Sequence, residues 1–175
     1  MKLFRHFSSL TTAMLMILIG ASCGGTAKPI SQHRLGEKVA VGSITYSALT
    51  ADYRQQIAGA KDPVKDRYLV IFLSATNGTS QVATLPHTRL IAANGKEIPE
   101  LTEIDGFPQW LGLLRTVSAS GTEQGYVVFD APVGTYKLQV SSGGDPEKEQ
   151  LAQIEIPANL VPASPGGVAG PSLGN

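Results

Sequence analysis

The sequence predicts an all-β fold, a sandwich of about seven to nine strands. Short apolar or alternating runs recur from Gly36 to Pro157, and turn residues separate them at short intervals. The chain is also rich in turn-forming residues, with 19 Gly and 11 Pro. Many short strands with closely spaced turns are typical of sandwiches. The 175 residues allow one such domain with tails.

The first two strand signals lie before residue 80. Lys38 to Ser47 alternates, and this alternation slips at Gly42-Ser43, which predicts a β-bulge. The run from Tyr68 to Thr76 is almost continuously apolar and stops at the turn dipeptide Asn77-Gly78. We therefore expect this run to be a central strand covered on both faces. The core candidates of the first run are Val39, Val41, Ile44 and Tyr46.

A weaker strand and a hairpin follow. Ser80 to Leu85 is the weaker strand, and Pro86 ends it. Arg89 to Ala92 and Lys96 to Ile98 flank Ala93-Asn94-Gly95. Asn-Gly predicts a hairpin because both residues tolerate positive φ.

Three further strands complete the domain. Gln124 to Ala131 ends at Pro132, and Thr135 to Ser141 alternates with Tyr136, Leu138 and Val140 on one face. Leu151 to Ile156 is the last strand before Pro157.

Three segments do not fit a simple strand pattern. Residues 51–60 could form a short helix or a wandering connection, and residues 107–117 could form a helical turn or a strand. Residues 158–175 are rich in Pro and Gly, and we expect disorder there because they bury too little apolar area to offset their ordering entropy.

The N-terminus has the three parts of a secretory signal peptide. Lys2, Arg5 and His6 form a basic head, Ala13 to Ile19 is unbroken apolar sequence, and small residues follow up to Cys23. The apolar run is shorter than the roughly 20 residues that a transmembrane helix needs. We expect residues 1–22 to be removed on export.

Cys23 is the only cysteine of the chain and lies at the expected cleavage site. Ile19-Gly20-Ala21-Ser22-Cys23 resembles the bacterial lipobox, with Gly20 in place of the usual Leu. The resemblance implies that the Cys23 thiol is acylated, and two or more acyl chains give stable membrane anchoring. Residues 23–35 would then hold the lipidated cysteine and a flexible tether. The alternative is cleavage near Ala21, which would leave a free thiol on a secreted protein.

Charge and cysteine content exclude several classes of protein. Fourteen Lys+Arg balance fourteen Asp+Glu, and loss of residues 1–22 removes Lys2 and Arg5 and leaves a slightly acidic protein. Nucleic acid binding needs a clustered basic surface, so we expect none. A single cysteine allows no intramolecular disulfide and no cysteine-built metal site.

The order of signals in the body resembles a known family. Its most specific part is the run from Gly125 to Leu138, preceded by Gly36 to Val41, the long strand from Tyr68 and the hairpin at Asn94-Gly95. Residues 36–157 resemble the telokin-like, immunoglobulin-like domain of unknown function found in bacterial lipoproteins, a group related to immunoprotective extracellular proteins. The resemblance implies an immunoglobulin-like β-sandwich and an exported or surface location, and it supplies no catalytic residues.

The sequence contains no convincing catalytic, cofactor or metal site. His87 is the only histidine of the body, so a triad would have to depend on it, and we expect a solvated loop residue instead. Three carboxylate clusters are candidates for Ca²⁺, and each is interpreted as solvated loop charge. These clusters are Asp62 with Asp66, Glu100-Glu103-Asp105, and Asp145-Glu147-Glu149.

Phe107 and Trp110 are the candidate interaction surface. We expect Trp110 and its apolar neighbours to pack in the core, and the alternative is an exposed aromatic loop. We therefore predict a membrane-anchored envelope lipoprotein that is not an enzyme and serves as an interaction or structural module, with another envelope protein as its partner. The alternative is an extracytoplasmic protein that binds a small ligand or Ca²⁺.

Overall fold

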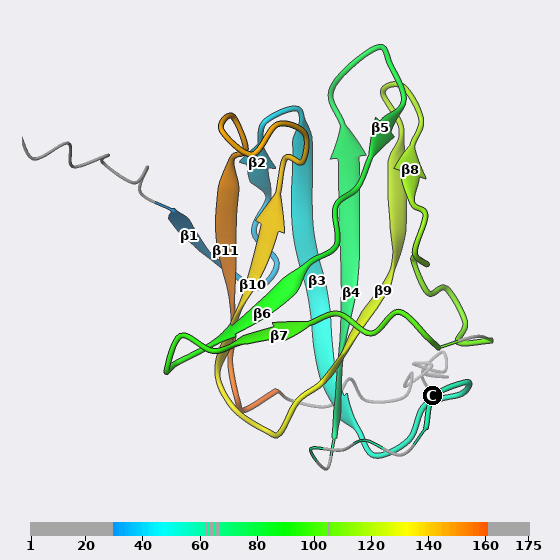
Figure 1. The fold of residues 1–175 in the computed structure, drawn as a ribbon, viewed down its shortest axis with the longest axis vertical. Helices are drawn as coiled ribbons and strands as arrows, with labels where there is room; N and C mark the ends of the chain where they lie inside the picture. Colours follow the sequence, from blue (N-terminus) through cyan, green and yellow to red (C-terminus); the bar gives the residue numbers. More distant parts are fainter. Residues whose placement is uncertain (1–29, 62, 64, 66, 105, 161–175) are drawn as a thin grey trace, which may run out of the picture.

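The computed structural model describes residues 30–61, 63, 65, 67–104 and 106–160. These residues form eleven strands and no helix, and therefore no helix long and apolar enough to cross a membrane. Two main sheets face each other as a β-sandwich, which confirms the predicted all-β fold (Figure 1).

One main sheet has five strands and the other has four. The five-stranded sheet has the order β1-β11-β10-β6-β7, with bounds Ser31–Arg34, Leu151–Ile156, Tyr136–Ser141, Arg89–Ala92 and Glu97–Pro99. The four-stranded sheet has the order β2-β3-β4-β9, with bounds Val39–Val41, Ile44–Arg54, Tyr68–Asn77 and Thr122–Asp130. A small ribbon pairs β5 (Ala83–Thr84) with β8 (Thr116–Val117).

The main core lies between the two sheets and follows the alternation of the strands. The core residues expected in the run from Lys38 to Ser47, which forms β2 and the start of β3, are all buried: Val39, Val41, Ile44 and Tyr46. The hydroxyl of Tyr46 spans the layers and donates a hydrogen bond to the carbonyl of Ser141 at 2.8 Å. The phenol of Tyr46 is thus paired within an otherwise apolar part of the core.

Strand β4 is central, as predicted, and its first part from Tyr68 to Ile71 is buried on both faces, whereas Phe72, Ser74 and Thr76 on the outer face are partly exposed. Leu69, Ile71 and Leu73 point into the main core. Tyr68 and Val70 point the other way, into a second cluster with Ile104, Phe107 and Val128. This burial on both faces explains why the sequence is continuously apolar from Tyr68 to Ile71, because none of these positions is exposed to water.

The predicted bulge at Gly42-Ser43 is wrong. Val41 pairs with Ile44, so Gly42 and Ser43 are the two-residue turn of the β2–β3 hairpin, and Gly42 has a φ of 61°. The register shift of β3 occurs at Leu49, between Ala48 and Thr50. A two-residue turn also interrupts the alternation, and the sequence pattern does not distinguish these two causes.

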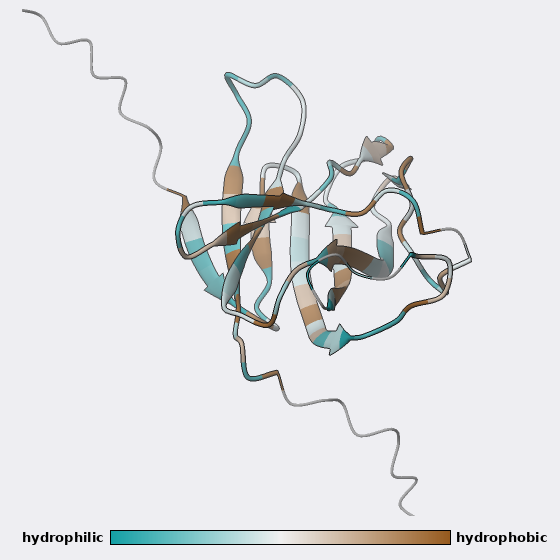
Figure 2. Ribbon diagram, turned by 60° about the horizontal axis from the view of Figure 1, so that its bottom comes forward, coloured by the Kyte–Doolittle hydropathy of each residue, from teal (hydrophilic) through white to brown (hydrophobic). Residues whose placement is uncertain are grey.

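The N-terminal boundary of the domain at residue 36 is also wrong. Residues 31–34, which were expected to belong to the tether, form β1 and pair in parallel with β11 from Ser31↔Ala152 to Arg34↔Glu155. The side chains of β1 are polar and mostly exposed, and the strand is drawn in teal in Figure 2. It is held by its main chain, so hydropathy gives no signal for it.

Neither of the two undecided segments forms a helix. β3 continues to Arg54, and a turn-rich connection follows through residues 55–61. Residues 107–115 run as turns and bends before the short β8. The weak strand expected at residues 80–85 is present only as the two-residue strand β5. Residues 158–160 of the expected disordered tail are described, whereas residues 161–175 lie outside the described part.

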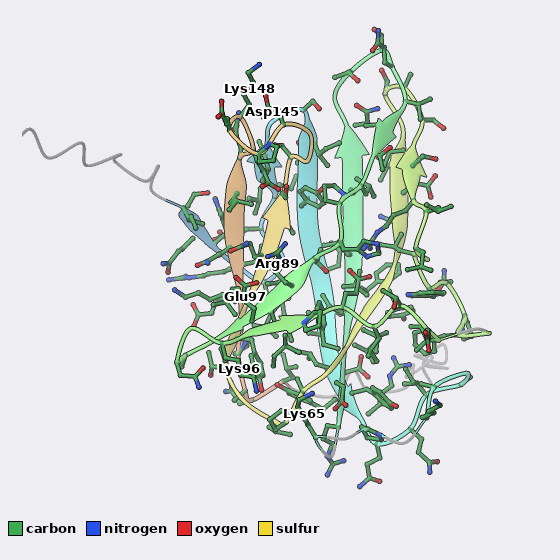
Figure 3. All side chains as sticks on the ribbon, viewed as in Figure 1. Lys65, Arg89, Lys96, Glu97, Asp145 and Lys148 are labelled. Atoms are coloured by element: carbon green, nitrogen blue, oxygen red, sulfur yellow. The ribbon has the colours of Figure 1, made fainter. Side chains whose placement is uncertain are left out.

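The hairpin predicted around Asn94-Gly95 is confirmed. Strands β6 and β7 pair from Arg89↔Pro99 to Ile91↔Glu97, and Gly95 has a φ of 80°. The Asn94 side-chain oxygen accepts a hydrogen bond from the Lys96 N–H at 3.0 Å. Arg89 and Glu97 extend side by side from the hairpin, with a nitrogen–oxygen distance of 2.9 Å (Figure 3).

Candidate interaction site

The segment from Glu100 to Arg115 lies along the free edge of β9. The Leu101 N–H donates to the Val128 carbonyl at 2.8 Å, and the Tyr126 N–H donates to the Gln109 carbonyl at 2.8 Å. The Leu111 N–H donates to the Tyr126 carbonyl at 3.1 Å. The exposed edge of a strand can pair with another chain, and this segment covers the edge of β9.

Close packing at Gly125 fixes the segment against the strand. A Cβ at this position would lie 2.5 Å from the Gln109 carbonyl oxygen and 2.9 Å from the Leu111 side chain. Only glycine allows this approach. Gln109 itself has a φ of 56°, an uncommon conformation for a residue with a side chain.

Phe107 and Trp110, the predicted interaction surface, pack on the outer face of the four-stranded sheet. Phe107 is buried, and Trp110 is half-buried against the same cluster. The rings of Phe107 and Tyr126 meet edge to face at 5.5 Å. The two residues are thus packing residues, which was the expected role of Trp110. The Trp110 Nε1 is enclosed without a hydrogen-bond partner among the described residues.

Arg54 extends over this aromatic cluster. Its guanidinium carbon lies 5.7 Å from the Phe107 ring centre and 5.6 Å from that of Tyr126, within cation–π range. Its Nε donates to Asp52 at 2.6 Å, and this hydrogen bond raises the pKa of Arg54. Because Arg54 and Asp52 form an ion pair, their charges balance beside the aromatic residues on the outer face of the four-stranded sheet.

The exposed apolar residues of this segment are Leu113 and Leu114. Their relative exposures are 48% and 98%. They lie between the anchored stretch at Leu111 and the Arg115 carbonyl, which accepts a hydrogen bond from the Leu85 N–H at 3.0 Å. The expectation that the apolar neighbours of Trp110 pack in the core is therefore wrong for these two leucines, and the exposed residues of the loop are aliphatic rather than aromatic.

A buried ion pair ties the end of this segment to the five-stranded sheet. The Arg115 Nη2 donates to the Glu100 Oε2 at 2.7 Å, with side-chain exposures of only 3% and 1%. The N–H and hydroxyl of Thr88 donate to the same oxygen at 3.0 and 2.9 Å. The Glu100 Oε1 and Arg115 Nε have no partner among the described residues. Glu100 is thus engaged with the protein and is not the solvated loop carboxylate that the sequence suggested.

His87 belongs to the rim of this ion pair. Its Nδ1 lies 3.0 Å from the Arg115 Nη2, so the neutral ring accepts there, and its side chain is 46% exposed. No serine hydroxyl or cysteine thiol hydrogen-bonds to His87 in the described part of the chain. His87, Arg115 and Glu100 thus form a hydrogen-bonded cluster in which His87 is not paired with a nucleophile.

Two of the other candidate carboxylates, Asp145 and Glu149, also have protein partners. Asp145 pairs with Lys148 at 3.7 Å (Figure 3) and accepts from the Glu147 N–H at 3.1 Å. Glu149 accepts a short hydrogen bond from the Ser141 hydroxyl. Asp62, Asp66 and Asp105 lie outside the described residues. Among the described residues, no group of three or more His, Cys, Asp or Glu is placed to hold a metal ion.

Two polar residues near strand ends have structural roles. Asn77 is buried, and its amide donates to the carbonyls of Gln81, Val117 and Ser118 at 2.6, 3.3 and 3.2 Å. β4 ends at Asn77, as the Asn77-Gly78 dipeptide predicted, and the Thr79 N–H donates to the Asn77 side-chain oxygen at 2.9 Å. Asp130 accepts from the Lys65 N–H at 3.0 Å, which fixes the loop before β4.

A groove runs beside the second half of β3. β2 pairs with β3 only as far as Tyr46, and the Gly36 N–H donates to the Ala48 carbonyl at 2.8 Å. Beyond that point, β3 has no strand partner opposite β4 among the described residues. The cavity there measures about 640 Å³. Its walls are Leu35, residues 49–54, Tyr126, Pro157, Asn159 and Leu160.

The parallel pairing of β1 with β11 defines the end of the sandwich at which the N-terminal segment enters. Ser31 lies beside Ala152, next to the loop of residues 142–150, and far along the sheet from Ile156. Figure 1 shows this end with the β2–β3 turn at the top of the view, and the β3 groove lies at the other end. Cys23 lies outside the described residues.

No family model matches the sequence, and no curated protein is similar to it in sequence. Solved structures do match. The chain is similar to the yjhA protein from Bacillus subtilis with a TM-score of 0.54 and 14% identity, over 70% of this chain and 98% of that one.

Two further structures are similar over nearly the same region. One is a putative lipoprotein (ycdA) from Bacillus subtilis subsp. subtilis str. 168, with a TM-score of 0.56, 15% identity, and coverage of 69% of this chain and 38% of that one. The other is a functionally unknown protein from Listeria monocytogenes EGD-e, with a TM-score of 0.52, 10% identity, and coverage of 70% and 81%. At these identities the likeness establishes the β-sandwich fold, and the telokin-like family itself stays a prediction.

Proposed function

We propose that this protein is a lipoprotein of the cell envelope, anchored through Cys23, whose β-sandwich is a non-catalytic module that binds another envelope protein. The observation that carries the proposal is the position of the only cysteine, directly after a signal-like segment and close to the first strand. The similarity in fold to a putative lipoprotein supports it. So does the resemblance of residues 36–157 to the telokin-like domain of bacterial lipoproteins.

The anchor would orient the sandwich. Cys23 and Ser31 are eight positions apart (31 − 23 = 8), so the connecting chain reaches at most about 26–29 Å. The end that carries the start of β1, the β2–β3 turn and loop 142–150 would then face the membrane. The β6–β7 hairpin tip and the β3 groove would point away from it.

The Leu113–Leu114 tip is the surface that we assign to the partner. Leu114 is almost fully exposed on a segment that hydrogen bonds hold at Leu111 and Arg115. An apolar side chain presented on a fixed loop gains about 1.5–3 kcal/mol when a partner buries it. A protein surface with a matching apolar pocket suits this shape.

In-cell cross-linking of the full-length protein tests the proposal. We expect one reproducible cross-linked partner in the wild type and its loss in Leu114→Ser. Val133→Ser removes another exposed apolar residue elsewhere and should leave the cross-link intact. Equal cross-linking of the wild type and Leu114→Ser would contradict the assignment of the surface. If a correctly anchored wild type gave no cross-linked partner, the proposal that the β-sandwich binds another envelope protein would be wrong.

A further inference from the structure

On the groove side, the second half of β3 has main-chain groups that pair with no described strand. Core-facing residues of β3 turn their N–H and C=O groups toward β2, as Ile44 does in the closing pair of the hairpin and Ala48 does in its bond to Gly36. Face and edge alternate together in a strand, so core-facing Ala51 and Tyr53 turn theirs toward the groove. No main-chain hydrogen bond reaches these two residues from the groove side in the described part of the chain.

The same sheet is covered at β9 and along the first half of β3. Residues 101–111 lie along β9, and β2 with Gly36 lies along β3 as far as Ala48. The stretch from Leu49 to Arg54 differs from both, because no described segment lies along its groove side. Exposed strand edges pair readily with another chain. This stretch is therefore suited to receive an added strand.

The groove beside this stretch has apolar walls, and its charges balance. Leu35, Leu49 and Leu160 contribute to the walls. Among the described lining residues, the two that carry charge are Asp52 and Arg54, which pair with each other at 2.6 Å. A charged occupant would lose hydration here without meeting an unpaired charge. The groove therefore suits an uncharged occupant.

The shape of the site suits an extended chain. The cavity of about 640 Å³ is within the size range of ligand pockets. Residues 49–54 extend for about 17 Å along the edge. A peptide in the extended conformation presents N–H and C=O groups along such a length, which are the partners that Ala51 and Tyr53 require.

We propose that the edge of β3 from Leu49 to Arg54 binds an extended, uncharged peptide segment of another protein as an added strand. Main-chain hydrogen bonds to Ala51 and Tyr53 hold the peptide. Peptide residues opposite these two share their face of the sheet, so apolar side chains there face Leu35 and Leu160, which pack against the main core. In this binding mode the main chain supplies affinity and the alternate side chains supply specificity.

A second copy of the chain is a less suitable occupant. Two copies of this edge would pair about a two-fold axis and run antiparallel. The register that pairs Ala51 of one copy with Tyr53 of the other stays within β3, and it sets the two Asp52 side chains opposite each other. Like charges directly opposite are unfavourable.

The peptide site is separate from the surface assigned above to the envelope partner. Neither Leu113 nor Leu114 is among the residues that line the groove. The site therefore goes beyond the proposed function, and it does not depend on acylation of Cys23.

Selection from a display library of random nonapeptides on the immobilised full-length protein tests the proposal. We expect the enriched peptides to have apolar residues at alternating positions and no proline between them. A saturating amount of such a peptide should slow hydrogen exchange of the Ala51 and Tyr53 amides at least about tenfold.

Main-chain N-methylation of an enriched peptide is the matched control on the ligand. Successive N–H groups of a strand point to opposite edges, so only every second one bonds to β3. Methylation at one of these positions should weaken binding about tenfold. Methylation at the intervening positions should leave the affinity nearly unchanged.

A pair of exposed apolar residues provides the matched control on the protein. Leu49 lines the groove and is 41% exposed, so Leu49→Asp is tolerated by the fold and places a charge beside the apolar segment. We expect it to weaken peptide binding about tenfold. Val82 is 67% exposed and is not among the lining residues, and Val82→Asp should bind as the wild type does.

Failure to enrich any peptide, or enriched peptides that protect neither amide, would overturn the proposal. Equal weakening by methylation at successive positions would also overturn it. Protection without peptide would overturn it in favour of a second copy if it rises with protein concentration, and in favour of the chain itself if it does not. Binding that is lost in Leu114→Ser and unchanged in Leu49→Asp would move the peptide to the Leu113–Leu114 tip, so failure here and failure of the proposed function are distinguishable.

Discussion

At the scale of single residues, Glu100 and Arg115 connect the segment beside β9 to the five-stranded sheet. They form the one ion pair of the described residues in which both side chains are almost fully buried. Removing one partner leaves an uncompensated buried charge. We expect Arg115→Ala to lower the free energy of unfolding by about 3–5 kcal/mol, measured by urea denaturation.

Arg89 and Glu97 provide the matched control. Their pair has a comparable distance of 2.9 Å, but both side chains are exposed. Solvent screens such a pair, and Arg89→Ala should cost less than about 1 kcal/mol. Similar losses for the two variants would show that burial does not determine the strength of the Glu100–Arg115 contact.

Three tyrosines determine the response to alkaline pH. Burial raises the pKa of Tyr46, Tyr53 and Tyr136, so the folded state favours the protonated phenol. The unfolded pKa is about 10, and the native state binds more protons above it. We therefore expect these tyrosines to add no pH dependence to the free energy of unfolding below about pH 9 and to lower it as the pH rises above about 10.

The Tyr46→Phe variant measures how much Tyr46 contributes to the loss of stability at alkaline pH. The variant loses the hydrogen bond to Ser141, which should cost about 1 kcal/mol at pH 7. Its stability should then decline less steeply than that of the wild type between about pH 10 and 11. A parallel decline in both proteins, followed by equilibrium unfolding at each pH, would rule out Tyr46 as a source of the effect.

At the scale of elements, Gly125 allows the segment 109–111 to lie against β9. Gly125→Ala would place a Cβ 2.5 Å from the Gln109 carbonyl oxygen, so the segment must shift. We expect a loss of about 1–3 kcal/mol in unfolding free energy and faster exchange of the Tyr126 amide. Gly134→Ala meets its nearest neighbour only at 3.4 Å and should change neither measurement.

The elements also show how far local sequence patterns predict this fold. The β6–β7 hairpin and the doubly buried β4 follow from side-chain preferences within a few residues. β1 does not, because its polar side chains face solvent and only its main chain pairs with β11, far away in sequence. The course of residues 107–111 likewise depends on the distant edge of β9.

The candidate site was less predictable than the fold. Phe107 and Trp110 mark the correct segment, but the sequence does not show that both lie against Tyr126 while Leu113 and Leu114 face outward. Glu100 and Arg115 are 15 positions apart (115 − 100 = 15), and no local motif links a carboxylate to a guanidinium at that spacing. Tertiary packing alone brings them together.

At the scale of the whole molecule, the sandwich has one end that receives the N-terminal segment and one that carries the β3 groove. If Cys23 is acylated, the first end is held within about 26–29 Å of the anchor. Two or more acyl chains make such attachment stable, whereas a free thiol provides none. Attachment of this protein to a membrane therefore depends on acylation of Cys23.

Mass spectrometry of the protein purified from membrane and soluble fractions tests anchoring through Cys23. We predict that the wild type is found in the membrane fraction, begins at Cys23 and carries acyl chains. Cys23→Ser should appear in the soluble fraction without them. A soluble, unacylated wild type, or a Cys23→Ser variant that stays in the membrane fraction to the same extent, would show that Cys23 does not anchor the protein.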